Sequence, residues 1–333
     1  MKSKTALITG IGGQDGSYLA ELLVSRGYSV HGIVRRESFE NNNHLTNLFS
    51  IIDRITVHPV SVDNHLGVYR LIKNIQPDEC YHLAASSFVS YEMDDEITVI
   101  SNNFNSTHYL LSSIKELAPA CRFYFAGSSE MFGDATESPQ FESTSFQPRS
   151  IYGISKVSSY HLVSNYRRHK NLFACSGILY NHESPRRGRE FVTRKITSSV
   201  ARISAGLQDR LVLGNLEAKR DWGYAPEYVN AMWAMLNQDL PDDYVIATGH
   251  LHTVREFVEC AFNVVNLDYR DYVETSSSYY RPDEKVPLTG DSTKARLKFH
   301  WKPQTDFQSL VETMVLGDIE ALEKKHQGAA VFA

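Results

Sequence analysis

The stretch TALITGIGGQDGSYLAELLVSR, residues 5–26, decides the fold class. It opens with apolar and β-branched residues, passes through Gly10, Gly13 and Gly16, and ends with apolar residues at helical spacing. Between a strand and a helix, such glycines let the backbone approach a pyrophosphate at the helix N-terminus. The stretch therefore predicts a dinucleotide-binding loop; a tight turn without a ligand is the alternative.

The alternation of strand and helix continues along the chain. Further strands are predicted at 29–34, 54–57, 79–83, 122–126 and 173–178, with helices near 66–74, 105–117 and 152–169. Repeated βα units of this kind predict an α/β fold, a Rossmann-type doubly wound parallel sheet.

Beyond about residue 179 the alternation weakens, and stretches rich in arginine, proline and glycine appear. We expect a Rossmann domain over residues 1–179 and a smaller C-terminal α/β substrate-binding region over 180–333. The segment 243–248 is apolar enough to return to the first sheet.

Composition excludes several classes of protein. The 333 residues are 42% hydrophobic and 22% charged with a net charge of −5, so neither a disordered chain nor a basic nucleic-acid-binding surface is expected. The four cysteines, at positions 80, 121, 175 and 260, have no C-x-x-C spacing, which is typical of reduced thiols. No apolar run is long enough for a signal peptide or a membrane span, so we expect a cytoplasmic protein that binds no membrane.

Two arginines follow the second predicted strand, where an NAD-binding protein commonly has an acid. The guanidinium groups of Arg35 and Arg36 suit the 2′-phosphate of NADP, so NADP is predicted over NAD. A solvated arginine pair in a loop is the alternative.

A candidate reacting centre follows the fifth strand. Tyr152 and Lys156 lie four residues apart on a predicted helix, and a lysine cation beside the phenol would lower its pKa for proton transfer. Ser128 and Glu130 stand at the carboxyl end of strand 122–126, where α/β sheets bind ligands. A helix cap at Ser128 and an ordinary first-turn acid at Glu130 remain the alternative.

A basic cluster comes next, with residues that would hold a diphosphate or form a solvated surface. It comprises His182, Arg186, Arg187, Arg189, Lys195 and Arg220. The sequence contains no metal-ligand pattern.

These residues resemble the extended short-chain dehydrogenase/reductases, and within them the GDP-mannose 4,6-dehydratase family. The resemblance covers nearly the whole chain, with its specific motifs at 8–20, 32–36, 181–188, 191–196, 220–223 and 243–249. It implies a lyase of deoxysugar biosynthesis that binds a GDP-sugar and assembles as a homotetramer.

The resemblance also implies roles for individual residues. Ser128, Glu130, Tyr152 and Lys156 would be catalytic. A tightly held NADP, regenerated in each turnover, would contact the loop with Gly10, Gly13, Gln14, Asp15 and Gly16, and also Arg35, Arg36, Leu83, Ala84, Ser87, Tyr152, Lys156, His182 and Arg187. The nucleotide of the substrate would contact Asn181, Lys195, Arg220, Arg281 and Glu284.

The reaction implied is oxidation at carbon 4 of the sugar, elimination of water across carbons 5 and 6, and return of the hydride to carbon 6. Ser61 and Ser86 depart from the family pattern, as does the stretch 91–98. A related GDP-hexose, GDP-hexosamine or GDP-heptose is therefore an alternative substrate to GDP-mannose.

Other functions remain open. A sugar-nucleotide 4-epimerase would need no acid at Glu130, a decarboxylase of the same superfamily often has one, and a non-catalytic NADP-binding regulator would need none of the reacting residues.

Overall fold

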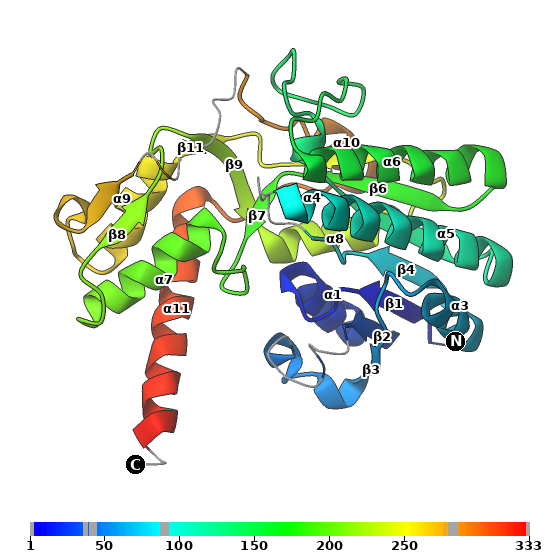
Figure 1. Cartoon of the computed structure of the whole chain (residues 1–333), viewed down its shortest axis with the longest axis horizontal. Helices are drawn as coiled ribbons and strands as arrows, with labels where there is room; N and C mark the ends of the chain where they lie inside the picture. The colour runs from blue at the N-terminus through cyan, green and yellow to red at the C-terminus, as the bar shows by residue number, and fades with distance from the viewer. Residues whose placement is uncertain are drawn as a thin grey trace.

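The computed structural model describes residues 3–35, 39, 45–86, 93–276, 278 and 286–330. Among these residues the central sheet has seven strands in the order β10-β6-β5-β4-β1-β2-β3, and all neighbouring strands are parallel. The predicted Rossmann-type sheet is therefore confirmed (Figure 1). Its strands are β1 Thr5–Thr9, β2 Ser29–Val34, β3 Ile55–Pro59, β4 Glu79–His82, β5 Arg122–Ser128, β6 Ala174–Leu179 and β10 Tyr244–Ile246.

Helices cover both faces of this sheet, so its central strands β1, β4 and β6 are buried on both sides. One face packs against α1 Gln14–Ser25 and α8 Ala225–Leu236, with α10 Thr293–Phe299 beside α8. The other face packs against α3 His65–Ile75, α5 Ser106–Leu117 and α6 Ile151–Lys170.

Two elements differ from the sequence prediction. Helix α1 begins at Gln14, inside the glycine loop rather than after it, because Gly13 is its N-cap and Gly16 lies in its first turn. Helix α5 is preceded by α4 Met93–Ile100 and a π-helical turn, Ser101–Asn105, which the sequence did not predict. The segment 243–248 does return to the sheet, because it contains β10 next to β6.

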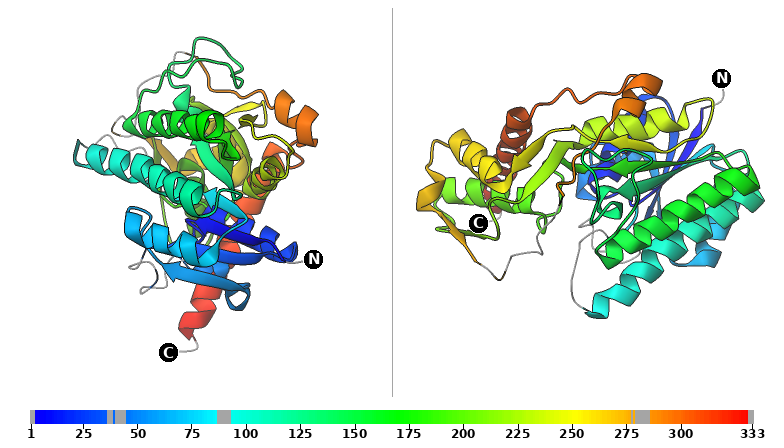
Figure 2. Two further views of the ribbon diagram at one scale, coloured as in Figure 1. Left: turned by 90° about the vertical axis from the view of Figure 1, so that its right-hand side faces the viewer. Right: turned by 90° about the horizontal axis from the view of Figure 1, so that it is seen from above.

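The C-terminal region has its own hydrophobic core around Trp222 and Phe257. A second sheet joins β11 Leu251–Thr253, β9 Lys219–Tyr224 and β7 Asn181–Glu183, while β8 Leu211–Leu213 pairs with β12 Val273–Thr275. Helices α7 Val192–Ser204, α9 Val254–Val264 and α11 Phe307–Ala330 gather around this core, away from the main sheet (Figure 2). In the described part of the chain, no helix is both long and apolar enough to cross a membrane.

Short 3-10 helices lie between the other elements, at Thr46–Leu48, Ile52–Arg54, Ser129–Met131 and Tyr269–Asp271. The third of them follows β5 directly and carries Glu130.

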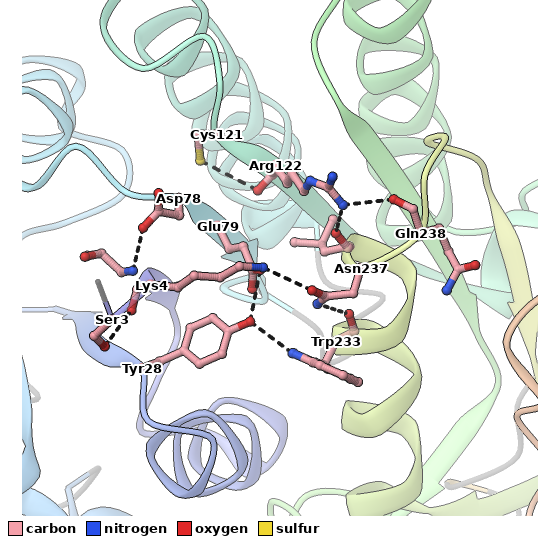
Figure 3. Close-up of polar contacts among 12 residues, drawn as sticks. Ser3, Lys4, Tyr28, Asp78, Glu79, Cys121, Arg122, Trp233, Asn237 and Gln238 are labelled. Carbon is pink, nitrogen blue, oxygen red and sulfur yellow. Dashed lines mark hydrogen bonds and ion pairs between the residues drawn. The ribbon is translucent and has the colours of Figure 1, made fainter. Parts of the chain in front are cut away.

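Polar contacts join residues at the amino ends of the strands to one another and to α8 (Figure 3). Lys4 Nζ lies 2.8 Å from Glu79 Oε1, and the Tyr28 hydroxyl donates to the same oxygen at 3.1 Å. The Arg122 guanidinium donates to the backbone oxygens of Leu236, the last residue of α8, and of Gln238 just after it. These bonds fasten β1, β4 and β5 to α8 at the edge opposite the loops that follow the strands.

Candidate functional site

A cavity of about 490 Å³ lies at the carboxyl ends of the parallel strands. The loops that follow β1 to β6 line it on one side, and residues of β7 and β9 line it on the other. Ligands of open α/β sheets bind at this edge, so the cavity is the candidate functional site.

The glycine loop forms one wall of the cavity. Gly10 has a φ of +72°, and a Cβ at Gly16 would lie 2.2 Å from the Gly10 oxygen, so larger residues do not fit at either position. Among the described residues no side chain caps α1, whose N-cap is Gly13. The unpaired N–H groups of its first turn, with the positive end of the helix dipole, therefore favour an anion in the cavity.

Asp15 and His182 form an ion pair across the cavity wall, with His182 Nε2 2.8 Å from Asp15 Oδ2. His182 Nδ1 lies 2.7 Å from the Tyr180 oxygen, and the ring stacks on Tyr228 with centroids 4.6 Å apart. Burial alone would lower the pKa of His182, but the charge and hydrogen bond of Asp15 raise it overall. The pKa of Asp15 is lowered because His182 outweighs the effect of burial. The pair therefore favours imidazolium and carboxylate, and the imidazolium compensates the negative charge that Asp15 brings to the first turn of α1.

Polar contacts join the glycine loop to β7 and to the segment that follows it. Gln14 Nε2 donates to the His182 oxygen at 3.0 Å, and Gln14 Oε1 accepts from Ser184 Oγ at 2.8 Å. Arg186 donates to Glu21 at 2.7 Å, so its guanidinium holds α1 rather than facing a diphosphate. Arg187, which lines the cavity, forms an ion pair with Glu183, with Nε 3.2 Å from Oε2 but without hydrogen-bond geometry.

Ser128, Glu130 and Tyr152 meet at the end of β5, and all three line the cavity. Ser128 Oγ accepts from the Glu130 N–H at 3.3 Å, so Ser128 does cap the 3-10 helix. The same side chain also hydrogen-bonds Tyr152. A Cβ at Gly153 would lie 2.6 Å from the Glu130 oxygen, so glycine allows the start of α6 to approach Glu130 this closely. The serine that the sequence singled out as a candidate reacting group is thus also the helix cap.

Lys156 is 4% exposed and donates from Nζ to the Ala126 oxygen at 2.8 Å. Its Nζ lies 5.6 Å from the centroid of the Tyr152 ring. Burial lowers the pKa of Lys156 to about 7 and raises that of Tyr152 to about 12, where the hydrogen bond of Ser128 only partly offsets burial. The direction for Tyr152 is opposite to the sequence expectation, because burial of the phenol dominates.

The cavity brings together most of the residues singled out from the sequence. Its lining includes Gly10, Gly13, Gln14, Asp15, Gly16, Arg35, Leu83, Ala84, Ser128, Glu130, Tyr152, Lys156, Asn181, His182, Arg187 and Arg220. Lys195, on α7, is not in the lining. Arg36, Ser87, Arg281 and Glu284 lie outside the described residues.

Sequence reasoning missed several lining residues. Val60, Val62 and Asp63 follow β3, and Tyr180 follows β6, so the rule that ligands bind beyond strand carboxyl ends could have found them. Asn102, in the π-helical turn, carried no such signal. Within the described ranges, His, Cys, Asp and Glu form no group of three or more that could hold a metal ion.

Comparison with known proteins identifies the family. The family model described as GDP-mannose 4,6 dehydratase matches residues 7–314. The chain belongs to this GDP-mannose 4,6-dehydratase family. Curated relatives in the family include GDP-mannose 4,6 dehydratase 1 of Arabidopsis thaliana, which is 45% identical over 97% of this chain and 91% of its own length. The human GDP-mannose 4,6 dehydratase is 44% identical over 95% of this chain and 92% of its own length.

Solved structures show that the family fold is shared more widely. The dTDP-glucose 4,6-dehydratase of Bacillus anthracis, in complex with NAD, superposes with a TM-score of 0.83 at 20% identity, covering 96% of this chain and 98% of its own. RMD from Pseudomonas aeruginosa, complexed with NADPH, gives 0.80 at 18% identity, covering 96% and 100%. At these identities the likeness concerns the fold alone.

Proposed function

We propose that this chain is a GDP-sugar 4,6-dehydratase, a hydro-lyase that converts GDP-mannose to its 4-keto-6-deoxy derivative. The observation that carries the proposal is the position of Glu130 beside Tyr152 and Ser128 in the cavity lining. A base other than the tyrosine is needed to remove the proton at carbon 5, and Glu130 supplies it. Family membership supports the same assignment.

The cavity residues fit a nicotinamide dinucleotide. The uncapped start of α1 suits a pyrophosphate, and Arg35, Lys156, His182, Arg187 and Arg220 bring cationic groups to the lining. The chemistry that the cofactor supplies when bound is uptake of a hydride from carbon 4 of the sugar and its return to carbon 6.

The protein's residues then divide the proton transfers. Tyr152, as phenolate, accepts the proton of the 4-hydroxyl. Burial opposes this phenolate by raising the pKa of Tyr152, whereas the hydrogen bond of Ser128 and the cationic form of Lys156 favour it. Ser128 donates a hydrogen bond to the carbonyl oxygen that develops at carbon 4. The ketone acidifies carbon 5, where Glu130 removes the proton and passes it to the departing 6-hydroxyl, so that water leaves. A proton returns to carbon 5 when carbon 6 is reduced.

Mass spectrometry of GDP-mannose incubated with the purified protein in deuterated water tests the proposal. Loss of one water with uptake of one deuterium at carbon 5 supports a 4,6-dehydratase. A 4-epimerase would leave the mass unchanged, and a decarboxylase would remove carbon dioxide from a uronic acid substrate. An unchanged mass with cofactor bound and no 4-epimer formed would instead direct the test to other GDP-hexoses, GDP-hexosamines and GDP-heptoses.

We further propose NADP rather than NAD as the cofactor. Arg35 lines the cavity at the end of β2, where a guanidinium can bind the 2′-phosphate of NADP. The fold itself does not decide the cofactor, because one solved structure of this fold contains NAD and another NADPH. Arg35→Ala should weaken NADP by about tenfold or more and leave NAD nearly unchanged in a binding titration. Equal losses for both cofactors would contradict the assignment.

We also propose a cytoplasmic homotetramer. The four cysteines are free thiols, which is typical of a reducing compartment, and the resemblance to the family supports the tetramer. Light scattering on the purified protein tests the assembly, and a monomeric mass would refute it.

A further inference from the structure

Gln140 is fully buried in the loop that joins the Glu130 helix to α6. Described residues occupy all four hydrogen-bonding positions of its side-chain amide. Nε2 donates to the Glu137 oxygen at 2.5 Å and to the Pro287 oxygen at 3.2 Å. Oε1 accepts from the Tyr180 hydroxyl at 2.7 Å and from the Thr289 N–H at 3.0 Å. A buried amide satisfied in this way specifies one arrangement of its neighbours.

The backbone of Gln140 holds the same segment. Its N–H donates to the Thr289 oxygen at 2.8 Å, and its oxygen accepts from the Asp291 N–H at 2.8 Å, forming a parallel bridge to Gly290. From the other side, Asp221 on β9 accepts from the Gly290 N–H at 3.3 Å. The segment 287–291 is therefore clasped between the loop after Glu130 and the strand that carries Arg220.

We call Gln140 and the segment 287–291 bonded to it the clasp. The clasp contacts the wall of the cavity. Tyr180 lines the cavity, and its hydroxyl is bonded to Gln140. A Cβ at Gly290 would lie 2.6 Å from the Tyr180 ring, so the segment packs directly on that side chain. In the sequence, the segment follows Arg281 and Glu284, for which the resemblance implies contact with the substrate nucleotide.

Within the described residues, Gln140 itself makes no hydrogen bond to the cofactor side of the cavity; Tyr180 reaches that side through its backbone oxygen, which lies 2.7 Å from His182 Nδ1. The partners of Gln140 are Glu137, Tyr180 and the segment 287–291, none of which belongs to the glycine loop, β2 or Lys156. A change at Gln140 should therefore affect the sugar nucleotide and leave the dinucleotide in place.

We propose that Gln140 is a positioning residue for the substrate: it holds Tyr180 and the segment 287–291 against the loop that follows Glu130, and so sets the affinity for the GDP-sugar. The inference rests on the proposed function, because it concerns the substrate of that same site.

Gln140→Glu tests the proposal, because it keeps the shape of the side chain but places a carboxylate oxygen against two backbone oxygens. We expect KM for GDP-mannose and the calorimetric Kd for GDP, measured on NADP-loaded protein, to rise about tenfold or more. The NADP content and kcat at saturation should stay near those of the wild type. Lower pH should reduce the defect, because a protonated carboxyl can donate again, whereas the defect of Gln140→Leu should not respond to pH.

Gln147→Glu is the matched control, since Gln147 is an exposed glutamine in the same loop. Its KM and Kd should equal those of the wild type. Tyr180→Phe removes a single hydroxyl and should raise KM by a smaller factor, which keeps the proposal testable if the Gln140 variants do not fold.

Two outcomes would overturn the inference while leaving the proposed function intact. One is a KM for GDP-mannose that is the same in Gln140→Glu as in the active wild type. The other is a parallel fall of kcat, NADP content and thermal midpoint, which would indicate a folding defect only. A wild type that neither binds GDP nor converts GDP-mannose would instead refute the proposed function, and this inference with it.

Discussion

The amino and carboxyl edges of the central sheet each hold a lysine, a tyrosine and a glutamate. At the amino edge these side chains are paired with one another, whereas at the carboxyl edge they line a cavity. At the amino edge, Lys4 and Tyr28 both contact Glu79 (Figure 3). The Tyr81 hydroxyl adds a third bond to that carboxylate at 2.7 Å. At the carboxyl edge, the lysine, tyrosine and glutamate are Lys156, Tyr152 and Glu130, and all three line the cavity.

The two lysines differ in the direction of their pKa shifts. Burial opposes the charge of Lys4, but its hydrogen bond to Glu79 prevails and raises its pKa. Lys156 is bonded to the backbone oxygen of Ala126, and burial lowers its pKa to about 7. Groups paired with one another stabilise a fold, whereas groups held beside a cavity with displaced pKa values are suited to proton transfer.

The largest effect is expected from Tyr152→Phe, which removes the group that accepts the first proton. Reduction of the bound cofactor on addition of GDP-mannose should slow by about a thousandfold or more. The absorbance of reduced nicotinamide in a single turnover measures this step. A normal rate of reduction would contradict the role of Tyr152.

Glu130→Gln should separate the two halves of the reaction. The cofactor should still become reduced, but loss of water should slow by about 10²–10⁴-fold because no base removes the proton at carbon 5. Deuterium uptake and product mass measure the second half. Near-native release of product would show that another group acts as the base.

Lys156→Met should change the pH dependence of stability. The folded pKa of Lys156, about 7, lies below the ordinary value of 10.5, so between these values the unfolded chain binds the additional proton. The unfolding free energy of the cofactor-free wild type should therefore rise relative to the variant as pH increases through this window. Thermal midpoints measured across the window give the sign, and parallel curves would contradict the lowered pKa.

The smallest effect on catalysis is expected from Glu79→Gln at the amino edge. Losing the charge that pairs with Lys4 should destabilise the fold by about 1–3 kcal/mol and lower the thermal midpoint by a few degrees. Turnover per folded enzyme should not change. A loss of turnover comparable with that of Glu130→Gln would show that the two edges do not divide their roles as described.

Much of the site could be predicted because its residues lie in short local patterns. The glycine loop, the pair Ser128 and Glu130, and the pair Tyr152 and Lys156 each follow a strand that the apolar pattern reveals. A strand followed by a loop places its next residues at one edge of the sheet, so sequence order alone brings these groups together.

The sequence by itself therefore determined the parallel sheet, the dinucleotide loop and the candidate reacting residues, because periodicity and spacing encode local structure. Only the tertiary structure decided the pairing of Asp15 with His182, which are 167 residues apart, and the clasp of Gln140 on Thr289, 149 residues away. It also decided the direction of the Tyr152 pKa, since the burial of a phenol depends on what packs around it. Such contacts join segments remote in sequence, and no local pattern specifies which buried polar groups will meet.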